Sequence, residues 1–154
     1  MSGSHIAEAW AIHDRIIRYL LASIPDEALS AVSASKGRTV AEQFAHMHNV
    51  RLMWLKAALP AALAGLTKLE KTALDRKSLN SELEKSGAAI TALLEHAVAD
   101  GDRVKGFKPH GAAFFAYLVS HESHHRGQIM LTLKQAGFPV DKKVAYGIWE
   151  WGVR

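Results

Sequence analysis

The chain has 154 residues, 49% of them hydrophobic, which is enough to bury the core of one domain without disulfide or metal staples. It contains no cysteine, so disulfides, thiolate metal ligands and cysteine nucleophiles are excluded, and any metal site must use nitrogen and oxygen ligands. The net charge of +4 comes from 19 basic and 15 acidic residues in mixed order, a pattern that does not predict nucleic-acid binding.

The N-terminal stretch MSGSHIAEAW has no basic region followed by an apolar run, so it does not resemble a signal peptide. No apolar stretch approaches the roughly 20 residues that a membrane-spanning helix needs. We therefore expect a cytoplasmic protein with no membrane partner.

Apolar residues recur three and four positions apart in long segments between breaker residues, which predicts an all-α fold. The first helix is expected over about residues 6–23, before Pro25. Its inward stripe comprises Ile6, Trp10, His13, Ile16, Ile17, Leu20 and Ile24. The second helix is expected from Thr39, whose side chain can cap the backbone N–H of Glu42, to about Leu59.

The segment that follows, residues 61–77, has no clear caps, and we expect a connection with one or two helical turns. The third helix is expected over about 78–99 and the fourth over about 112–136, closed by Gly137. Four helices with two long connections predict a four-helix bundle with crossovers between parallel neighbours. The bundle would form a single domain over residues 1–154.

The C-terminal tail, VAYGIWEWGVR, is rich in large apolar side chains. Tyr146, Ile148, Trp149 and Trp151 lie within it. Because each aromatic ring buries about 150 to 250 Å², we expect the tail to leave water. It would pack on the bundle as a flap that completes the core, or form part of a dimer contact.

The stretch SHESHHRGQIM holds three histidines. His121 and His125 are four residues apart, so they project from one helix face about 5.4 Å apart along the axis, a spacing suited to metal chelation. The same face carries side chains that we expect to point inward: Phe114, Tyr117, Leu118, Gln128, Ile129 and Thr132. A divalent cation would satisfy two imidazoles in an apolar interior, and a third ligand must come from another helix.

The second helix offers that ligand in AHMHNVRLMWL, where His46 and His48 lie on nearly opposite sides. Only one of them can face the site, and because both faces are apolar, periodicity does not choose between them. Asn49, three residues after His46, is a candidate for hydrogen bonding to a ligand residue or a substrate.

Two polar residues near His121 and His125 have both a possible functional role and a possible structural role. Glu122 lies about 100° round the helix from His121, so an ion pair with Arg126 is its expected role and general base the alternative. The hydroxyl of Tyr117, one turn before His121, is a candidate to reach an open coordination position or to bond a carbonyl. The remaining histidines, His5, His13, His96 and His110, are expected at the surface or in loops.

Three segments, AHMHNVRLMWL, SHESHHRGQIMLTLKQAG and YGIWEWG, together resemble the DinB/YfiT-like superfamily over essentially the whole chain. The resemblance implies a four-helix bundle, often a homodimer. One histidine of the second helix and an H-x-x-x-H pair of the fourth would bind a divalent metal such as Zn²⁺ or Ni²⁺. On this chain it selects His46, His121 and His125 as ligands and leaves His48 and His124 as extra.

Three neutral histidines would leave a metal with at least one open position, the arrangement of catalytic rather than structural sites. The resemblance implies thiol S-transferase chemistry, with bacillithiol or mycothiol as cofactor, or hydrolase-like chemistry on a small molecule. The alternative is a stress-related scaffold or binding protein whose metal stabilises the bundle without turnover. A pocket beside the metal favours the enzyme, whereas a metal covered by Trp54 or the aromatic tail favours the scaffold.

Overall fold

A computed structural model describes residues 2–72 and 74–154 of the chain. Its long helices are α1 (Ser2–Ala22), α2 (Val40–Ala58), α3 (Arg76–Ala99) and α4 (Gly111–Gln135), followed by the short helix α5 (Lys142–Gly147). Two 3-10 segments, η1 (Asp26–Ser30) and η2 (Pro60–Leu63), lie in the connections. The described residues contain helices and no strand, which confirms the all-α prediction. None of these helices is long and apolar enough to cross a membrane.

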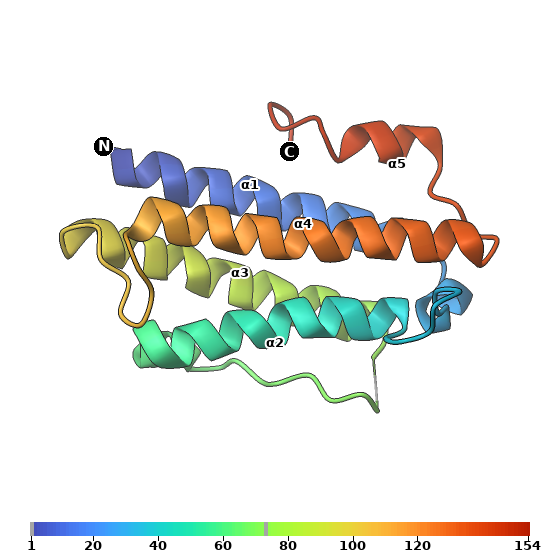
Figure 1. The fold of residues 1–154 in the computed structure, drawn as a ribbon, viewed down its shortest axis with the longest axis horizontal. Helices are drawn as coiled ribbons and strands as arrows, with labels where there is room; N and C mark the ends of the chain where they lie inside the picture. Colours follow the sequence, from blue (N-terminus) through green and yellow to red (C-terminus); the bar gives the residue numbers. More distant parts are fainter. Residues whose placement is uncertain (1, 73) are drawn as a thin grey trace.

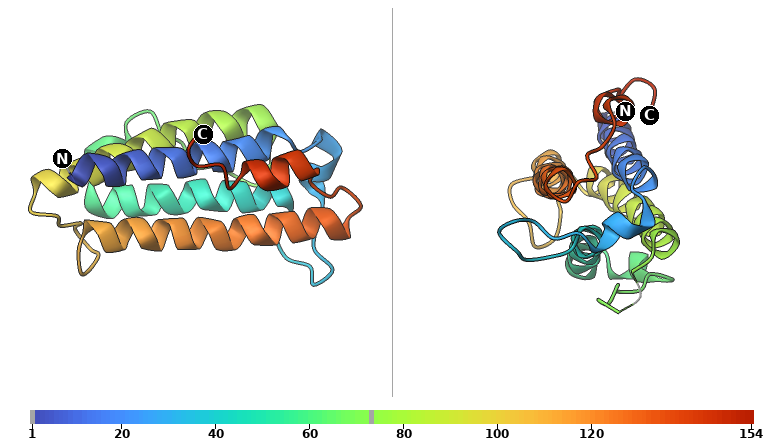
Figure 2. Two further views of the ribbon diagram at one scale, coloured as in Figure 1. Left: turned by 90° about the horizontal axis from the view of Figure 1, so that it is seen from above. Right: turned by 90° about the vertical axis from the view of Figure 1, so that its right-hand side faces the viewer.

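The long helices lie side by side along the length of the molecule (Figure 1). Helices α1 and α4 run in one direction, and α2 and α3 run in the other. Helix α3 packs against both α1 and α2, and α4 contacts α2 and α1 (Figure 2). The connection between the parallel neighbours α2 and α3, described at residues 59–72 and 74–75, returns along the outside of the helices (Figure 1). Residue 73 of this predicted connection lies outside the described part.

The helix boundaries follow the capping signals in the sequence. The Thr39 hydroxyl accepts a hydrogen bond from the Glu42 backbone N–H at 3.1 Å, as predicted. Asp75 caps α3 in the same way, so that helix begins slightly before the predicted residue 78. After α4, Gly137 adopts a φ of +86°, a left-handed conformation that a glycine C-cap accepts without strain.

The apolar core consists of two clusters, one toward each end of the helices. One cluster includes Ile17, Phe44 and Ile129, and the other includes Trp10 and Phe114. Between them each long helix contributes polar side chains that are fully or almost fully buried: His13 and Asp14, His48 and Arg51, Ser86, and Glu122. We call these six residues the polar layer. It divides the core at the level where the histidines of α2 and α4 lie.

The C-terminal tail only partly completes the core. Val144 and Ile148 are buried and belong to the cluster around Ile17. Tyr146 and Trp149 stay 72% and 67% exposed, so the prediction that the aromatic rings of the tail leave water is wrong for these two. The tail lies along α1 (Figure 2, left), and the ring of Trp149 covers the guanidinium of Arg126 of α4 at 5.1 Å.

Candidate metal centre

Three histidines meet where α2 and α4 lie side by side. His46 of α2 and His121 and His125 of α4 each offer one ring nitrogen, and these atoms all lie within 4.8 Å of one another. The ring centroids of His121 and His125 are 4.7 Å apart, and that of His46 lies 5.3 Å from His121 and 4.7 Å from His125. We call these residues the triad. The structure therefore places His46, rather than His48, beside the pair that the spacing singled out.

The ring nitrogens of the triad are better arranged to coordinate a cation than to form hydrogen bonds with one another. Nδ1 of His125 lies 3.0 Å from Oε1 of Gln43. Since an amide oxygen only accepts, Nδ1 carries the proton and the lone pair of Nε2 stays free. Nδ1 of His121 is buried and has no hydrogen-bond partner among the described residues. Such an atom is costly unless it is satisfied, and the three residues could hold a divalent metal ion.

Burial keeps the triad in the neutral form that binds metals. It lowers the pKa of His125 to about 4, with further contributions from the neighbouring His121 and His46. It also lowers the pKa of His46, with help from the charge of Arg38. For His121, burial outweighs the opposing charge of Glu122, and the pKa again falls. At neutral pH all three imidazoles are therefore neutral, and each has one ring nitrogen with a free lone pair for a metal.

Glu122, next to His121 in sequence, points into the polar layer. Its carboxylate accepts two hydrogen bonds from Arg51, Nε to Oε2 at 2.7 Å and Nη2 to Oε1 at 2.8 Å, and lies 3.1 Å from Nε2 of His13. The expected pair with Arg126 is wrong, because Glu122 follows the buried Leu118 by one turn and faces the interior. Buried Arg126 instead lies under the Trp149 ring.

Arg51 has all its nitrogens bonded within the polar layer. Its Nη1 donates to Asp14 Oδ1 and to the carbonyl of Leu83, both at 2.9 Å. Burial alone raises the pKa of Glu122, but the charge of Arg51 and the hydrogen bonds from Arg51 and His13 together outweigh it and lower that pKa to about 2. A carboxylate with so low a pKa, both oxygens of which are bonded, is a poor general base.

His13, expected at the surface, is fully buried in this layer. The reason is visible in its spacing, because it lies on the inward stripe with Trp10 and Ile17. Its Nε2 is the atom that meets Glu122, while its Nδ1 has no hydrogen-bond partner within the described residues. His5, His96 and His110 are exposed, as expected.

His48 and Asn49 hold the crossover connection against α2. The ring nitrogens of His48 lie 3.0 Å from the Ser86 hydroxyl and 2.7 Å from the carbonyl oxygen of Thr67. The amide of Asn49 donates to the carbonyl of Leu69 and accepts from its N–H, each at 2.9 Å. The side-chain amide of Asn49 is thus hydrogen-bonded to the backbone of the connection. His48 lies away from the triad, on the buried side of α2.

Tyr117 does not point inward as predicted. It is 39% exposed, and its ring contacts those of Trp54 and Phe107, with centroids 5.7 and 5.3 Å apart. Trp54 also contacts Phe114, and none of its ring contacts within the described residues involves the triad. Gln128 is exposed as well, whereas Phe114, Leu118, Ile129 and Thr132 of the predicted inward face are buried.

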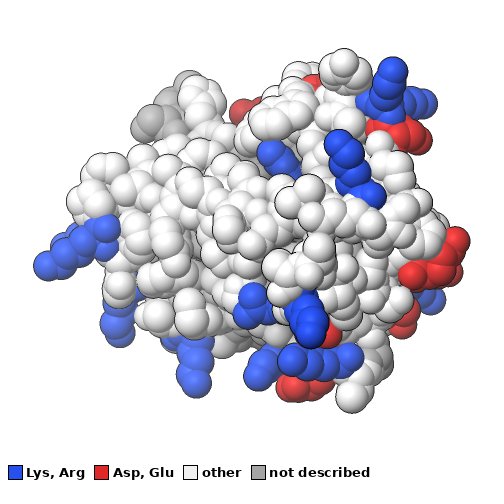
Figure 3. All heavy atoms as spheres, turned by 45° about the vertical axis from the view of Figure 1, so that its right-hand side comes forward, with Lys and Arg blue, Asp and Glu red and all other residues white. Residues whose placement is uncertain are grey.

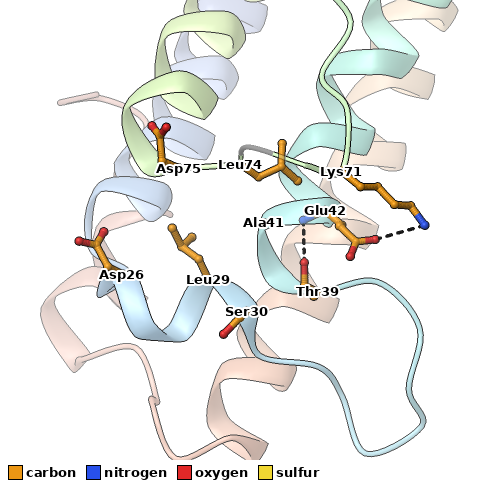
Figure 4. A pocket seen from close by; sticks show the side chains of 9 residues that line it. All are labelled: Asp26, Leu29, Ser30, Thr39, Ala41, Glu42, Lys71, Leu74 and Asp75. Carbon is orange, nitrogen blue, oxygen red and sulfur yellow. Dashed lines mark hydrogen bonds and ion pairs between the residues drawn. The ribbon is translucent and has the colours of Figure 1, made fainter.

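A hollow of about 180 Å³ borders the triad. Its wall includes Arg38, Glu42, His46 and Asn49. A larger hollow of about 440 Å³ lies beside it, at the end of the helices (Figure 4). The polar side chains of this larger hollow are already engaged in caps and ion pairs: Thr39, Asp75, Asp26, Glu42 and Lys71. The hollow at His46 is therefore the better place for a ligand.

The surface carries its charges in dispersed form on the face that Figure 3 displays, where Lys and Arg side chains are spread among uncharged residues.

A comparison with protein families identifies the family of the chain. The model of the DinB family matches residues 1–146. This range contains the four long helices and all three residues of the triad. A comparison with curated proteins found no significant match.

Proposed function

The chain belongs to the DinB family, and from that premise we propose that it is a divalent-metal-dependent enzyme acting on a small molecule, with thiol S-transferase or hydrolase-like chemistry. The ion would be Zn²⁺ or Ni²⁺, bound by His46, His121 and His125. The chain would form one DinB-type four-helix-bundle domain over residues 1–154.

One observation carries this proposal. Three neutral imidazole nitrogens converge within 4.8 Å, and no carboxylate belongs to the cluster within the described residues. Three protein ligands leave an ion with an open position, which a structural site with four protein ligands lacks. When bound, the ion would act as a Lewis acid and lower the pKa of a coordinated water or thiol.

Residues around the triad prepare it for such an ion. Gln43 holds the His125 ring in the tautomer that presents Nε2. The two hydrogen bonds from Arg51 to Glu122 join α2 to α4 directly beside His121, and so fix the distance between His46 and the pair on α4. The hollow at His46 leaves space for a small molecule.

The same arrangement favours the enzyme over a non-catalytic scaffold. In a scaffold, side chains would cover the metal, and Trp54 and the aromatic tail are the nearest candidates. Trp54 packs with Phe107, Phe114 and Tyr117, and Trp149 of the tail lies on Arg126. His46 borders open space instead.

A thiol screen tests the proposal. The zinc- and nickel-loaded protein would be incubated with bacillithiol, mycothiol or glutathione and an electrophile, and in parallel with ester and amide substrates. We expect metal-dependent product with at least one pair, and loss of that product on chelation or in His125→Ala. If the fully loaded protein turns over none of them, the scaffold becomes the better explanation.

We also propose a homodimer. The tail leaves Tyr146, Trp149 and Val153 largely exposed, and exposed aromatic side chains are enriched in protein interfaces. Sedimentation equilibrium should give twice the chain mass at micromolar concentration, and Trp149→Ser with Tyr146→Ser should shift the protein toward monomer. A monomer at high micromolar concentration would end this proposal.

A further inference from the structure

Arg38 stands at a fixed point just before the N-cap of α2, eight residues before the triad histidine of that helix. The loop that carries it is held at both ends, because the N–H of Val40 donates to the carbonyl of Ala31 at 3.0 Å and the N–H of Ala34 donates to Oε1 of Gln135 at 2.9 Å. Gly37 makes the final turn with a φ of +105°, a conformation that favours glycine. The guanidinium therefore starts from a defined backbone position.

Two hollows flank α2 at this point, and Arg38 borders both of them. The first, of about 180 Å³, also has His46 in its wall. The second, of about 280 Å³, has Gln43 in its wall, the residue that hydrogen-bonds to His125. Arg38 therefore borders both the space beside His46 and the space beside Gln43, the residue that positions His125.

The charge of Arg38 is unpaired within the part of the chain that the structure describes. Within the described residues it forms no ion pair, while the one carboxylate in the wall of the hollow, that of Glu42, extends toward Nζ of Lys71 at 3.7 Å (Figure 4). The triad contains no acidic group. A divalent ion and a free guanidinium together would make the site positive, because Glu42 is paired with Lys71 and Glu122 with Arg51.

We propose that Arg38 binds a carboxylate of the small molecule whose reacting end lies at the triad. The inference rests on the proposed function, since it assigns a charge and a group to the ligand of that site. A planar guanidinium binds a carboxylate through two parallel hydrogen bonds, which also sets the orientation of the ligand. A phosphate presents three acceptor oxygens and is usually met by more donors than one arginine and a lysine already paired with Glu42 provide.

Two thiols that differ only in the carboxylate test this assignment. Cobalt-loaded protein would be titrated with 3-mercaptopropionate and with 3-mercapto-1-propanol, and binding followed by the thiolate-to-cobalt absorption band. We expect the wild type to bind the acid about 10- to 100-fold more tightly, as a charge-assisted bidentate hydrogen bond would give. Metal content should be the same in all Arg38 variants, because Arg38 is not a ligand.

Substitutions then locate the group that recognises the carboxylate. Arg38→Gln should bind both thiols equally, and Arg38→Lys should keep only part of the preference, since it retains the charge but not the planar fork. Arg103→Gln is the matched control. Arg103 is exposed and paired with Asp100 by a local contact, so its loss should leave the preference unchanged.

The outcomes separate the subsite from the function. If Arg38→Gln keeps the preference, the ion itself binds the carboxylate and the subsite is rejected. Equal binding of both thiols by the wild type also rejects the subsite, while the band itself still supports thiol chemistry. No band with either thiol on fully loaded protein rejects the thiol chemistry and the subsite together. Inorganic phosphate and acetate would also be tested as competitors of thiol binding. If phosphate competes more strongly than acetate, and only when Arg38 is present, the proposal that Arg38 binds a carboxylate is overturned.

Discussion

The polar layer, to which all four long helices contribute, and the triad, which α2 and α4 form, lie at the same level, yet they differ in how their polar atoms are bonded. Most polar atoms of the layer have partners, with Nδ1 of His13 as an exception within the described residues. In the layer, each nitrogen of Arg51 and each oxygen of Glu122 has a partner. In the triad, His121 has a buried Nδ1 without a partner, and the three rings meet without an acidic group. A satisfied cluster fixes structure, whereas an unsatisfied one leaves binding capacity for a ligand.

Removing a member of the polar layer should produce the largest change in stability. Glu122→Ala leaves Arg51 fully buried with Asp14 as its remaining carboxylate partner, so we expect a loss of about 3 to 5 kcal/mol in the free energy of unfolding. Urea unfolding of the metal-free protein measures this loss without a contribution from any ion.

An exposed glutamate provides the control for that experiment. Glu84 reaches Arg18 at 4.0 Å with a largely solvated side chain, and Glu84→Ala should cost less than about 1 kcal/mol. Equal effects of the two substitutions would mean that the layer contributes no more than a surface ion pair, and the distinction between the two clusters would fail.

Removing a member of the triad should change metal binding instead. We expect about one divalent ion per chain in the purified protein, and a loss of more than about 100-fold in affinity in His125→Ala or His121→Ala, because two histidines remain. His124 is exposed and outside the cluster, so His124→Ala should keep the ion. Metal analysis after gel filtration distinguishes the two results, and full retention in both triad variants would refute the site.

The sequence is sufficient to predict the helices that carry the polar layer and the triad, but not which of their side chains meet across the helices. Thr39 and Gly137 signal helix ends locally, and the spacing of His121 and His125 fixes their common face, so these predictions needed no tertiary information. Arg51 and Glu122 are 71 positions apart, and their contact depends on the rotation of α2 against α4, which periodicity does not specify. The choice of His46 came from the family resemblance for the same reason.

Two other errors have physical causes that the sequence partly reveals. His13 was assigned to the surface by residue type, although its place among Trp10 and Ile17 on the inward stripe indicates burial. The size of Tyr146 and Trp149 predicts their burial, but α5 and its C-cap present Val144 and Ile148 to the core and leave these rings outside. Size alone does not determine which face of a short helix is buried.

His46 and His48 allow the triad and the polar layer to be compared within a single helix, because His46 belongs to the triad and His48 to the layer. Chelation should lower the melting temperature of the wild type and of His48→Ala, because bound metal stabilises the folded state, but scarcely that of His46→Ala. His48→Ala should instead cost about 1 to 3 kcal/mol with or without metal, since it leaves the Ser86 hydroxyl and the Thr67 carbonyl without this partner. The reverse pattern would make His48 the ligand.

Within the described residues, the hydrogen bond from His125 to Gln43 is the one side-chain hydrogen bond that connects the triad to the rest of the protein. Oε1 of Gln43 accepts from Nδ1 of His125 and keeps the ring in the tautomer that offers Nε2. Gln43→Leu retains the approximate volume but removes the acceptor. We therefore expect metal affinity to fall about 10- to 100-fold, measured by competition with a chromophoric chelator.

The control for Gln43 is Gln128, which is exposed on α4 and has no hydrogen bond to the triad within the described residues. Gln128→Leu should leave the affinity unchanged. Gln43→Glu sharpens the test, because a carboxylate acceptor keeps the tautomer and makes His125 a more basic ligand, so affinity should be retained or rise. If Gln43→Leu binds metal as tightly as the wild type, the orientation of His125 comes from packing alone, and the triad needs no hydrogen-bonded support of the kind that holds the polar layer together.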